Sequence, residues 1–318
     1  MRTLVTGGAG FIGSHLCERL VNDGHTVICI DNFDPYYSPE IKRNNIKHLI
    51  GKDSFKLVEA DIRNRKELER IFQRNVIEKI VHLAAKVGVR PSIQDPISYQ
   101  DTNVKGTLNL LELCKEHGAE HFIFGSSSSV YGISGKVPFS EKDQVNPISP
   151  YAVSKRACEL YSYAYSHLYA IHVSCLRFFT VYGPRQRPDM AMHKFTRLID
   201  QNKEVPMYGN GTSKRDFTYI NDIIDGILSV LSKEFNFEVF NLGSSKTVEL
   251  RHLISLIEEN LGKKAKIEQL PEQIGDVPLT YANISKSERL LGYQPKVSIE
   301  DGVKKFIRWY RGTRRMVT

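Results

Sequence analysis

The sequence lacks the features that mark membrane, secreted and zinc-binding proteins. No run of eighteen consecutive apolar residues occurs, so we expect no transmembrane helix. The five cysteines are scattered without a Cys-x-x-Cys pair, which argues against a disulfide framework and a zinc site. A β-rich run and a glycine turn come at the very start and leave no room for a signal peptide. We therefore expect a cytoplasmic protein with no membrane partner and no metal.

The sequence also has little concentrated charge. The net charge is +8, from 44 Lys and Arg against 36 Asp and Glu, and the dense basic run is Arg311–Arg315. Nucleic acid is one explanation, but a basic surface is commoner and anionic small ligands also favour basic pockets. We expect no nucleic-acid partner. The 318 residues are enough for two domains.

What the sequence does contain is an alternation of β-rich and amphipathic segments. The candidate strands are Thr3–Thr6, Thr26–Asp31, Phe55–Glu59, Lys79–Leu83, His121–Gly125 and His172–Arg177, and the helical patterns between them include Ile12–Asp23, Lys66–Arg74 and Asn103–His117. This rhythm predicts an α/β fold with a doubly wound parallel Rossmann-type sheet. The strands are rich in Val, Ile, Leu and Phe with little alternation, as expected for a sheet buried on both faces.

The rhythm breaks after Arg177. Residues 180–215 are rich in Pro and Gly, Phe237–Asn241 has the pattern of one more strand, and Leu250–Leu261 has a helical pattern. We expect an NAD-binding Rossmann domain from residues 1–179 plus about 216–246. A smaller C-terminal α/β substrate domain would comprise residues 180–215 plus about 247–318.

A glycine-rich turn follows the first predicted strand. Gly8, Gly10 and Gly13 satisfy the pattern G-x-G-x-x-G, which lets the backbone approach a pyrophosphate at a helix N-terminus. Asp31 ends the second strand, eighteen residues past Gly13, where a carboxylate binds ribose hydroxyls and repels a 2′-phosphate. The pair predicts NAD rather than NADP. Asp61, after the third strand, suits the adenine side, but a loop or helix-capping role explains it equally.

A tyrosine and a lysine share one face of a predicted helix. Ser149 suits the N-cap and Pro150 the first helical position, which places Tyr151 and Lys155 one turn apart. The ammonium and a positively charged nicotinamide should lower the tyrosine pKa from about 10 toward working pH. Tyr151 would then act as a general base toward a sugar hydroxyl. The spacing alone is common by chance, and the glycine turn in the same chain is what gives it weight.

Four serines, Ser126–Ser129, follow the fifth predicted strand. They come at the strand end where doubly wound sheets bind ligands, although a Ser-rich turn is the alternative. Together these motifs resemble the extended short-chain dehydrogenase/reductase family over essentially the whole chain. The resemblance implies a catalytic triad of Ser127, Tyr151 and Lys155, with Asn103 supporting the lysine. It also implies an NAD site whose other residues are Gly7, Gly10, Phe11, Ile12, Gly13, Asp31, Asn32, Asp61, Ile62, Leu83, Ala84 and Ala85.

Within that family, the loop after the fifth strand separates the reactions. Sugar-nucleotide 4,6-dehydratases carry an Asp-Glu pair there, and UDP-glucuronate decarboxylases carry a Glu just before Val-Tyr-Gly. This chain has Ser128 and Ser129. The resemblance therefore implies a UDP-sugar 4-epimerase, which inverts carbon 4 by transient hydride transfer to bound NAD through a 4-keto sugar.

The segment Phe179–Ala191 is similar to UDP-glucuronate 4-epimerases, with Thr180 where UDP-glucose epimerases usually have Asn. The likeness implies that Ser128, Ser129, Thr180 and Arg187 hold the substrate carboxylate, for which a guanidinium fork is well suited. The alternative is that Arg185 and Arg187 contact phosphate or lie in a basic loop.

Two further positions bear on the diphosphate of the substrate. Arg215 is similar to the diphosphate-binding arginine of the family, whereas Gln273-Ile274 stand where many relatives have another Arg. We expect conversion of UDP-glucuronate to UDP-galacturonate. The alternatives are a UDP-glucose or UDP-N-acetylglucosamine 4-epimerase, a UDP-glucuronate decarboxylase, or a non-catalytic NAD-binding protein.

The resemblance also implies a homodimer. Its interface would be built from the helices Asp101–His117 and Pro150–Tyr169 of each subunit. The second helix carries Tyr161, Tyr163, Tyr165 and Tyr169, which could equally pack within the monomer.

Overall fold

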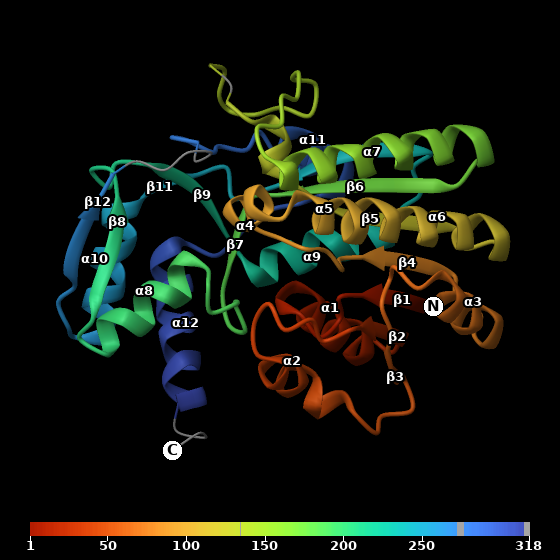
Figure 1. Cartoon of the computed structure of the whole chain (residues 1–318), viewed down its shortest axis with the longest axis horizontal. Coiled ribbons are helices and arrows are strands. Elements are labelled where there is room, and N and C mark those ends of the chain that lie inside the picture. Colours follow the sequence, from red (N-terminus) through yellow and green to blue (C-terminus); the bar gives the residue numbers. More distant parts are fainter. Residues whose placement is uncertain (134, 272–276, 315–318) are drawn as a thin grey trace.

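The structure is a computed structural model that describes residues 1–133, 135–271 and 277–314. Within these residues, seven parallel strands form one large sheet in the order β10-β6-β5-β4-β1-β2-β3 (Figure 1). The strands are β1 Arg2–Thr6, β2 Thr26–Asp31, β3 Phe55–Glu59, β4 Lys79–His82, β5 His121–Ser127, β6 His172–Phe178 and β10 Phe237–Leu242. The predicted α/β fold with a doubly wound parallel sheet is confirmed.

The large sheet is covered on both faces, as its apolar strands require. Neighbouring residues of β1 show this directly, because Val5 belongs to one hydrophobic cluster and Leu4 to the other. The first cluster includes side chains of α1 (Phe11–Asn22), α2 (Pro39–Ile46) and α9 (Ile220–Leu231). The second includes side chains of α3 (Arg65–Arg74), α6 (Gly106–His117) and α7 (Pro150–Tyr169).

The helix predicted over Asn103–His117 is more irregular than its pattern indicates. A π-helix over Gln100–Lys105 follows the short helices α4 (Val89–Gln94) and α5 (Pro96–Tyr99) and leads into α6. Such π-turns often lie at functional sites, and this one contains Asn103. Helix α7 begins as predicted, with the Ser149 hydroxyl accepting a hydrogen bond from the Ala152 amide and Pro150 in the first turn.

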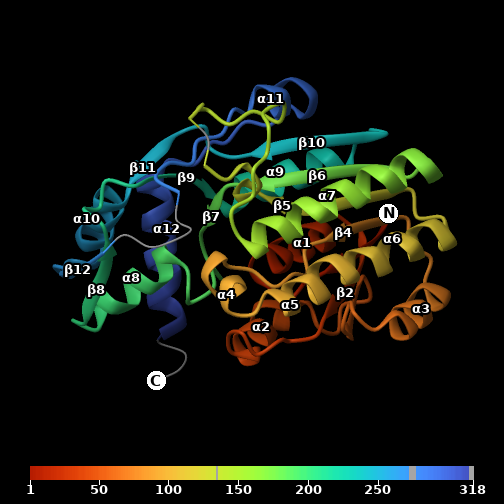
Figure 2. The same ribbon diagram turned by 45° about the horizontal axis from the view of Figure 1, so that its top comes forward.

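The remaining elements form a smaller part beside the large sheet. Among the described residues, β7 (Thr180–Tyr182), β9 (Lys214–Tyr219) and β11 (Thr247–Glu249) form one short sheet, and β8 (Glu204–Tyr208) and β12 (Lys266–Leu270) form another. The helices of this part are α8 (Ala191–Asp200), α10 (Leu250–Leu261) and α12 (Ile299–Arg314). Figures 1 and 2 both show β7 between the two parts.

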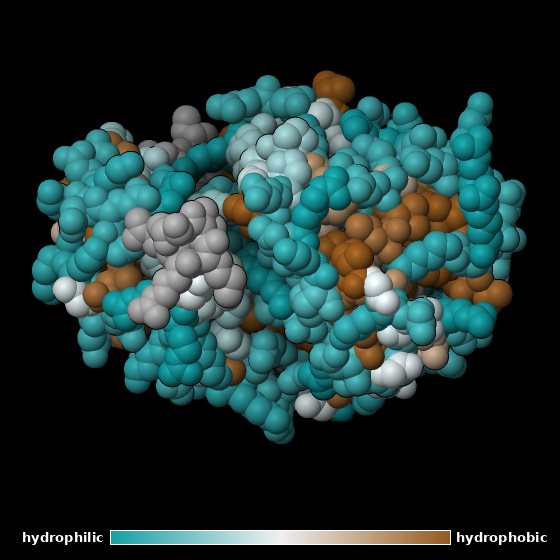
Figure 3. All heavy atoms as spheres, turned by 90° about the horizontal axis from the view of Figure 1, so that it is seen from below, coloured by the Kyte–Doolittle hydropathy of each residue, from teal (hydrophilic) through white to brown (hydrophobic). Residues whose placement is uncertain are grey.

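The structure departs from the expected domain boundaries at two places. The boundary near residue 216 falls within β9, and α11 (Ser285–Leu291) contacts β10 of the large sheet and α9 beside it. The division into two discontinuous domains stays a prediction. Among the described residues, none of the helices combines the length and hydrophobicity that a membrane crossing requires. Viewed from below, hydrophobic surface gathers mainly on the half that carries the large sheet (Figure 3).

Candidate active site

A cavity of about 700 Å³ opens along the carboxyl ends of the strands of the large sheet. This is the edge at which open α/β sheets bind ligands. Most of the residues predicted for cofactor and catalysis line it. They are Gly7, Gly10, Phe11, Ile12, Gly13, Asp31, Asn32, Ile62, Leu83, Ala84, Ala85, Ser127, Tyr151 and Lys155, and the predicted substrate residue Arg187 joins them.

The glycine turn leaves room for nothing larger than glycine at two positions. Gly7 has φ +68°, and a Cβ there would lie 2.8 Å from the Ala84 amide nitrogen. A Cβ on Gly13 would lie 2.2 Å from the Gly7 carbonyl oxygen. Gly10 caps α1 without a side-chain hydrogen bond, so the first-turn amides of the helix face the cavity without competition from a capping group. This cradle fits a dinucleotide pyrophosphate.

Asp31 lies at the end of β2 in the wall of the cavity and is 6% exposed. One carboxylate oxygen accepts a hydrogen bond from the Ala9 amide at 3.1 Å and the other from the Phe33 amide at 2.9 Å. Burial raises the pKa of Asp31, and the Lys42 ammonium and the two amides oppose that rise. Each oxygen keeps a further lone pair with which to accept a ribose hydroxyl.

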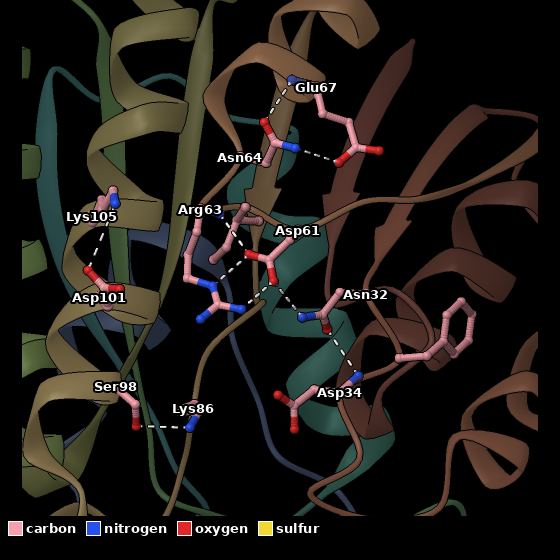
Figure 4. Close-up of polar contacts among 12 residues, drawn as sticks. Asn32, Asp34, Asp61, Arg63, Asn64, Glu67, Lys86, Ser98, Asp101 and Lys105 are labelled. Carbon is pink, nitrogen blue, oxygen red and sulfur yellow. Dashed lines mark hydrogen bonds and ion pairs between the residues drawn. The ribbon is translucent and has the colours of Figure 1, made fainter.

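Asp61 does not line the cavity, and its carboxylate is occupied by its neighbours (Figure 4). Arg63 binds it through Nε at 3.0 Å and through the terminal guanidinium nitrogen at 2.8 Å, and Asn32 donates to it at 3.0 Å. Hydrogen bonds from Arg63 lower the pKa of Asp61 to about 2. Ile62 and Arg63 line the cavity in its place.

Sequence reasoning missed three basic side chains in the cavity wall, Lys42, Arg63 and Lys86. Lys42 comes from α2, a helix that was not predicted, and donates to the Asp34 carbonyl at 2.8 Å. The spacing Asp61-x-Arg63 was a local signal for the second, since charged side chains two residues apart in a loop can pair.

Tyr151 and Lys155 of α7 and Ser127 at the end of β5 all line the cavity. Burial raises the pKa of Tyr151, while a hydrogen bond with Ser127 and the positive charge of Arg187 lower it. The expectation that Lys155 lowers this pKa was wrong for the geometry seen here. The Lys155 ammonium instead donates to the Gly125 carbonyl at 2.6 Å, and burial lowers its own pKa to about 8.

Asn103 is buried in the π-helix and does not line the cavity. Its side-chain oxygen accepts from the Lys86 amide at 2.7 Å, and its side-chain nitrogen donates to the Lys86 carbonyl at 3.0 Å. The same nitrogen donates to the Ser154 hydroxyl at 2.9 Å. Asn103 therefore ties the loop after β4, which lines the cavity, to the helical turn that carries Lys155.

Four of the predicted substrate residues do not line the cavity. Ser128 and Ser129 start a 3₁₀ turn, in which the Ser129 amide donates to the Ser127 hydroxyl at 3.1 Å. Thr180 begins β7, and Arg215 on β9 donates to the Pro278 carbonyl at 3.3 Å. Their substrate roles stay predictions. The positions Gln273-Ile274 lie outside the described residues.

The two arginines whose roles the sequence left open, Arg185 and Arg187, lie in different surroundings. Arg187 lines the cavity, is 17% exposed, and pairs with Asp189 at 3.1 Å. Among the described residues, its buried Nε has no hydrogen-bond partner. Arg185 does not line the cavity and pairs with Glu18 of α1 at 2.6 Å. Arg187 therefore brings a positive charge into the cavity wall, where a guanidinium is suited to an anion.

Comparisons with known proteins agree with this geometry. The family model described as GDP-mannose 4,6 dehydratase matches residues 4–306. A UDP-glucuronate 4-epimerase of Thermodesulfobacterium geofontis is 42% identical over 308 residues, which cover 96% of this chain and 95% of that protein. The solved structure of a UDP-glucuronic acid 4-epimerase from Bacillus cereus, in complex with UDP-glucuronic acid and NAD, superposes with a TM-score of 0.93 at 39% identity. It covers 98% of this chain and all of that one.

A second solved structure is a UDP-glucose 4-epimerase from Thermotoga maritima with UDP-glucose. It has a TM-score of 0.92 and 33% identity and covers 99% of this chain and all of that one. Both neighbours therefore share the whole fold with this chain, and the substrates named for them differ at carbon 6 of the sugar.

Proposed function

This chain belongs to the GDP-mannose 4,6-dehydratase family, and from that premise we propose that it is an NAD-dependent UDP-sugar 4-epimerase that interconverts UDP-glucuronate and UDP-galacturonate. The observation that carries the proposal is Arg187. Its side chain lines the same cavity as Tyr151 and Ser127, and its positive charge acts on Tyr151. A substrate carboxylate beside the reacting carbon would pair with that guanidinium.

NAD, when bound, supplies a hydride acceptor that later returns the hydride to the sugar. Gly7 and Gly13 would allow its pyrophosphate to approach α1, and Asp31 would accept hydrogen bonds from its ribose hydroxyls. Tyr151 takes the proton of the carbon-4 hydroxyl and gives it back to the inverted product. The Ser127 side chain is hydrogen-bonded to the Tyr151 phenol and orients the sugar hydroxyl. Lys155 fixes the end of β5 through the Gly125 carbonyl.

The carboxylate must also be kept in place during the reaction. The 4-keto form of glucuronate is a β-keto acid and can lose carbon dioxide. Arg187, with Thr180, Ser128 and Ser129 as further predicted contacts, would hold the carboxylate near the carbonyl plane, where bond cleavage is poorly aligned. The chain has serines after β5, where dehydratases and decarboxylases carry acids. This supports an epimerase over either alternative.

The strongest competing substrate is UDP-glucose, because the Thermotoga maritima neighbour carries it on the same fold. The test is to incubate purified protein, without added NAD, with UDP-glucuronate, UDP-glucose and UDP-N-acetylglucosamine and to resolve the products. We expect UDP-galacturonate to form with the highest kcat/KM. Turnover of the neutral sugars alone would overturn the choice of substrate, and no turnover with any sugar would overturn the epimerase itself.

We also propose that the enzyme works as a cytoplasmic homodimer through α6 and α7. Helix α7 exposes apolar side chains along one side, including Val153 at 50%, Leu160 at 53% and Leu168 at 66%. Tyr161, Tyr163 and Tyr169 are also more than 40% exposed. Tyr165 instead donates to Glu112 of α6 within the subunit. Light scattering should give twice the chain mass, and a monomer at all concentrations would contradict the proposal.

A further inference from the structure

The loop that carries Arg187 is fastened to α1, the helix whose N-terminus forms the cofactor cradle. We propose that Glu18 and Arg185 are positioning residues, which hold Arg187 where it meets the substrate carboxylate and so help to set substrate specificity. The inference rests on the proposed function, because it assigns Arg187 to that carboxylate.

The first observation is an arginine at a turn position that favours glycine. The Gln186 amide donates to the Gly183 carbonyl at 3.2 Å, Pro184 is the second residue of the turn, and Arg185 is the third, with φ +63°. This is the arrangement of a type II turn, in which the left-handed third residue is usually Gly or Asn. An arginine there is strained, and such strain persists only where the surroundings impose it.

The second observation is an ion pair that imposes this strained backbone conformation on Arg185. The Arg185 guanidinium pairs with the Glu18 carboxylate at 2.6 Å, and the two side chains are only 19% and 32% exposed. Although partial burial acts to raise it, the pKa of Glu18 stays below its ordinary value because of Arg185. His48 also contacts Glu18, at 3.2 Å. The carboxylate is therefore charged at working pH and holds the turn by an ion pair.

A second bond from α1 reaches the same turn. The His15 ring nitrogen Nε2 donates to the Pro184 carbonyl at 2.9 Å. Burial, with a smaller effect of Arg185, lowers the pKa of His15 to about 4, so the ring is neutral and Nε2 carries the proton. His15 and Glu18 are three residues apart on one helical face. His15 also contacts Phe11, which lines the cavity.

The far side of the turn is fixed independently. The Gln186 side-chain nitrogen donates to the Val181 carbonyl at 3.0 Å, and the Gln186 main-chain carbonyl accepts from His193 of α8 at 2.6 Å. Arg187 follows directly, and its partner Asp189 also accepts from the Tyr36 hydroxyl at 3.3 Å. Arg187 thus lies between an anchor on the smaller part and an anchor on α1. Loss of the α1 anchor should move its guanidinium relative to the cofactor and Tyr151.

Arg185→Gly is the sharpest test, because glycine relieves the strained turn while removing the ion pair. We expect its kcat/KM for UDP-glucuronate to fall on the order of 10- to 100-fold, the range that a small misplacement of a binding group produces. The fraction of decarboxylated pentose product should rise. Bound NAD and activity toward UDP-glucose should change less than threefold. Glu18→Gln should behave alike, and the double variant should be no worse than either single one.

Arg19→Ala is the matched control. Arg19 lies on the same helix and pairs with Asp23 and with Asp225 of α9, away from the turn. It should leave both the substrate preference and the product ratio unchanged. If wild type epimerises UDP-glucuronate but Arg185→Gly and Glu18→Gln keep its selectivity and product ratio, the positioning role is overturned and the proposed function stands. If wild type does not act on UDP-glucuronate, the proposed function fails first.

Discussion

Removal of the Arg187 guanidinium should lower kcat/KM more for UDP-glucuronate, whose sugar carries a carboxylate, than for UDP-glucose, whose sugar is neutral. Arg187→Ala deletes the one charged donor that we assign to the carboxylate, and a hydrogen bond to a charged group contributes about 1.5–3 kcal/mol. At 1.4 kcal/mol for each factor of ten, kcat/KM for UDP-glucuronate should fall roughly 10- to 150-fold. The side chain is 17% exposed, so solvent screening should weaken this effect little.

The same substitution has a second effect that does not depend on the substrate carboxylate. The positive charge of Arg187 lowers the pKa of Tyr151, so its removal should raise that pKa further. A general base with a higher pKa is deprotonated only at higher pH. The rising limb of the kcat/KM profile should therefore shift to higher pH for UDP-glucose as well as for UDP-glucuronate.

The assay measures kcat/KM for both sugars from about pH 7 to about pH 11, which spans the ordinary tyrosine pKa of about 10, together with the ratio of uronate to pentose products. Wild type and Arg187→Ala are compared for bound NAD first, to confirm an intact cofactor site. An equal loss for both sugars at their optimal pH, with no pentose released, would refute the carboxylate assignment. It would leave Arg187 as an electrostatic partner of Tyr151 alone.

Three further substitutions test the rest of the site. Tyr151→Phe should retain NAD but lose at least 100-fold in kcat, in the range of general acid–base catalysis, and near-normal turnover would contradict its role. Gly13→Ala should lose bound NAD on purification, since its Cβ would lie 2.2 Å from the Gly7 carbonyl oxygen, and full NAD content would show that the turn can relax. Glu159→Ala leaves the buried Arg177, which it binds at 2.9 Å, without its carboxylate. Thermal unfolding should show a loss of about 3–5 kcal/mol, and an unchanged Tm would show that solvent or another group replaces Glu159.

The sequence predicted those parts of the site that local motifs specify. The glycine turn, Asp31 and the Tyr151–Lys155 pair each depend on a strand end or a single helical turn, and the parallel sheet brings all of them to one edge. Fold and cofactor site follow from the same strand–helix rhythm. Asn103 was assigned by resemblance, and its contacts with Lys86 and Ser154 became apparent only from the structure.

The parts that the sequence could not predict depend on contacts between distant segments. Nothing in the spacing of Tyr151 and Lys155 indicates that the ammonium would turn to the Gly125 carbonyl, because that carbonyl belongs to another element. Likewise, the pairing of Arg177 with Glu159 joins β6 to α7 in a buried position. The electrostatics of the site therefore depend on contacts that only the folded chain brings together.

Local motifs and contacts between distant segments also determine different properties of the enzyme: the first determine the class of reaction, and the second the choice of substrate. The groups that move a proton and cradle a dinucleotide lie on the large sheet and on helices packed against it, where packing and register fix them. Arg187, which we assign to the carboxylate, lies on a loop beyond β7 whose position depends on the Glu18–Arg185 ion pair, 167 residues apart in sequence. A change at Glu18 should therefore alter substrate preference while leaving the chemistry at carbon 4 intact.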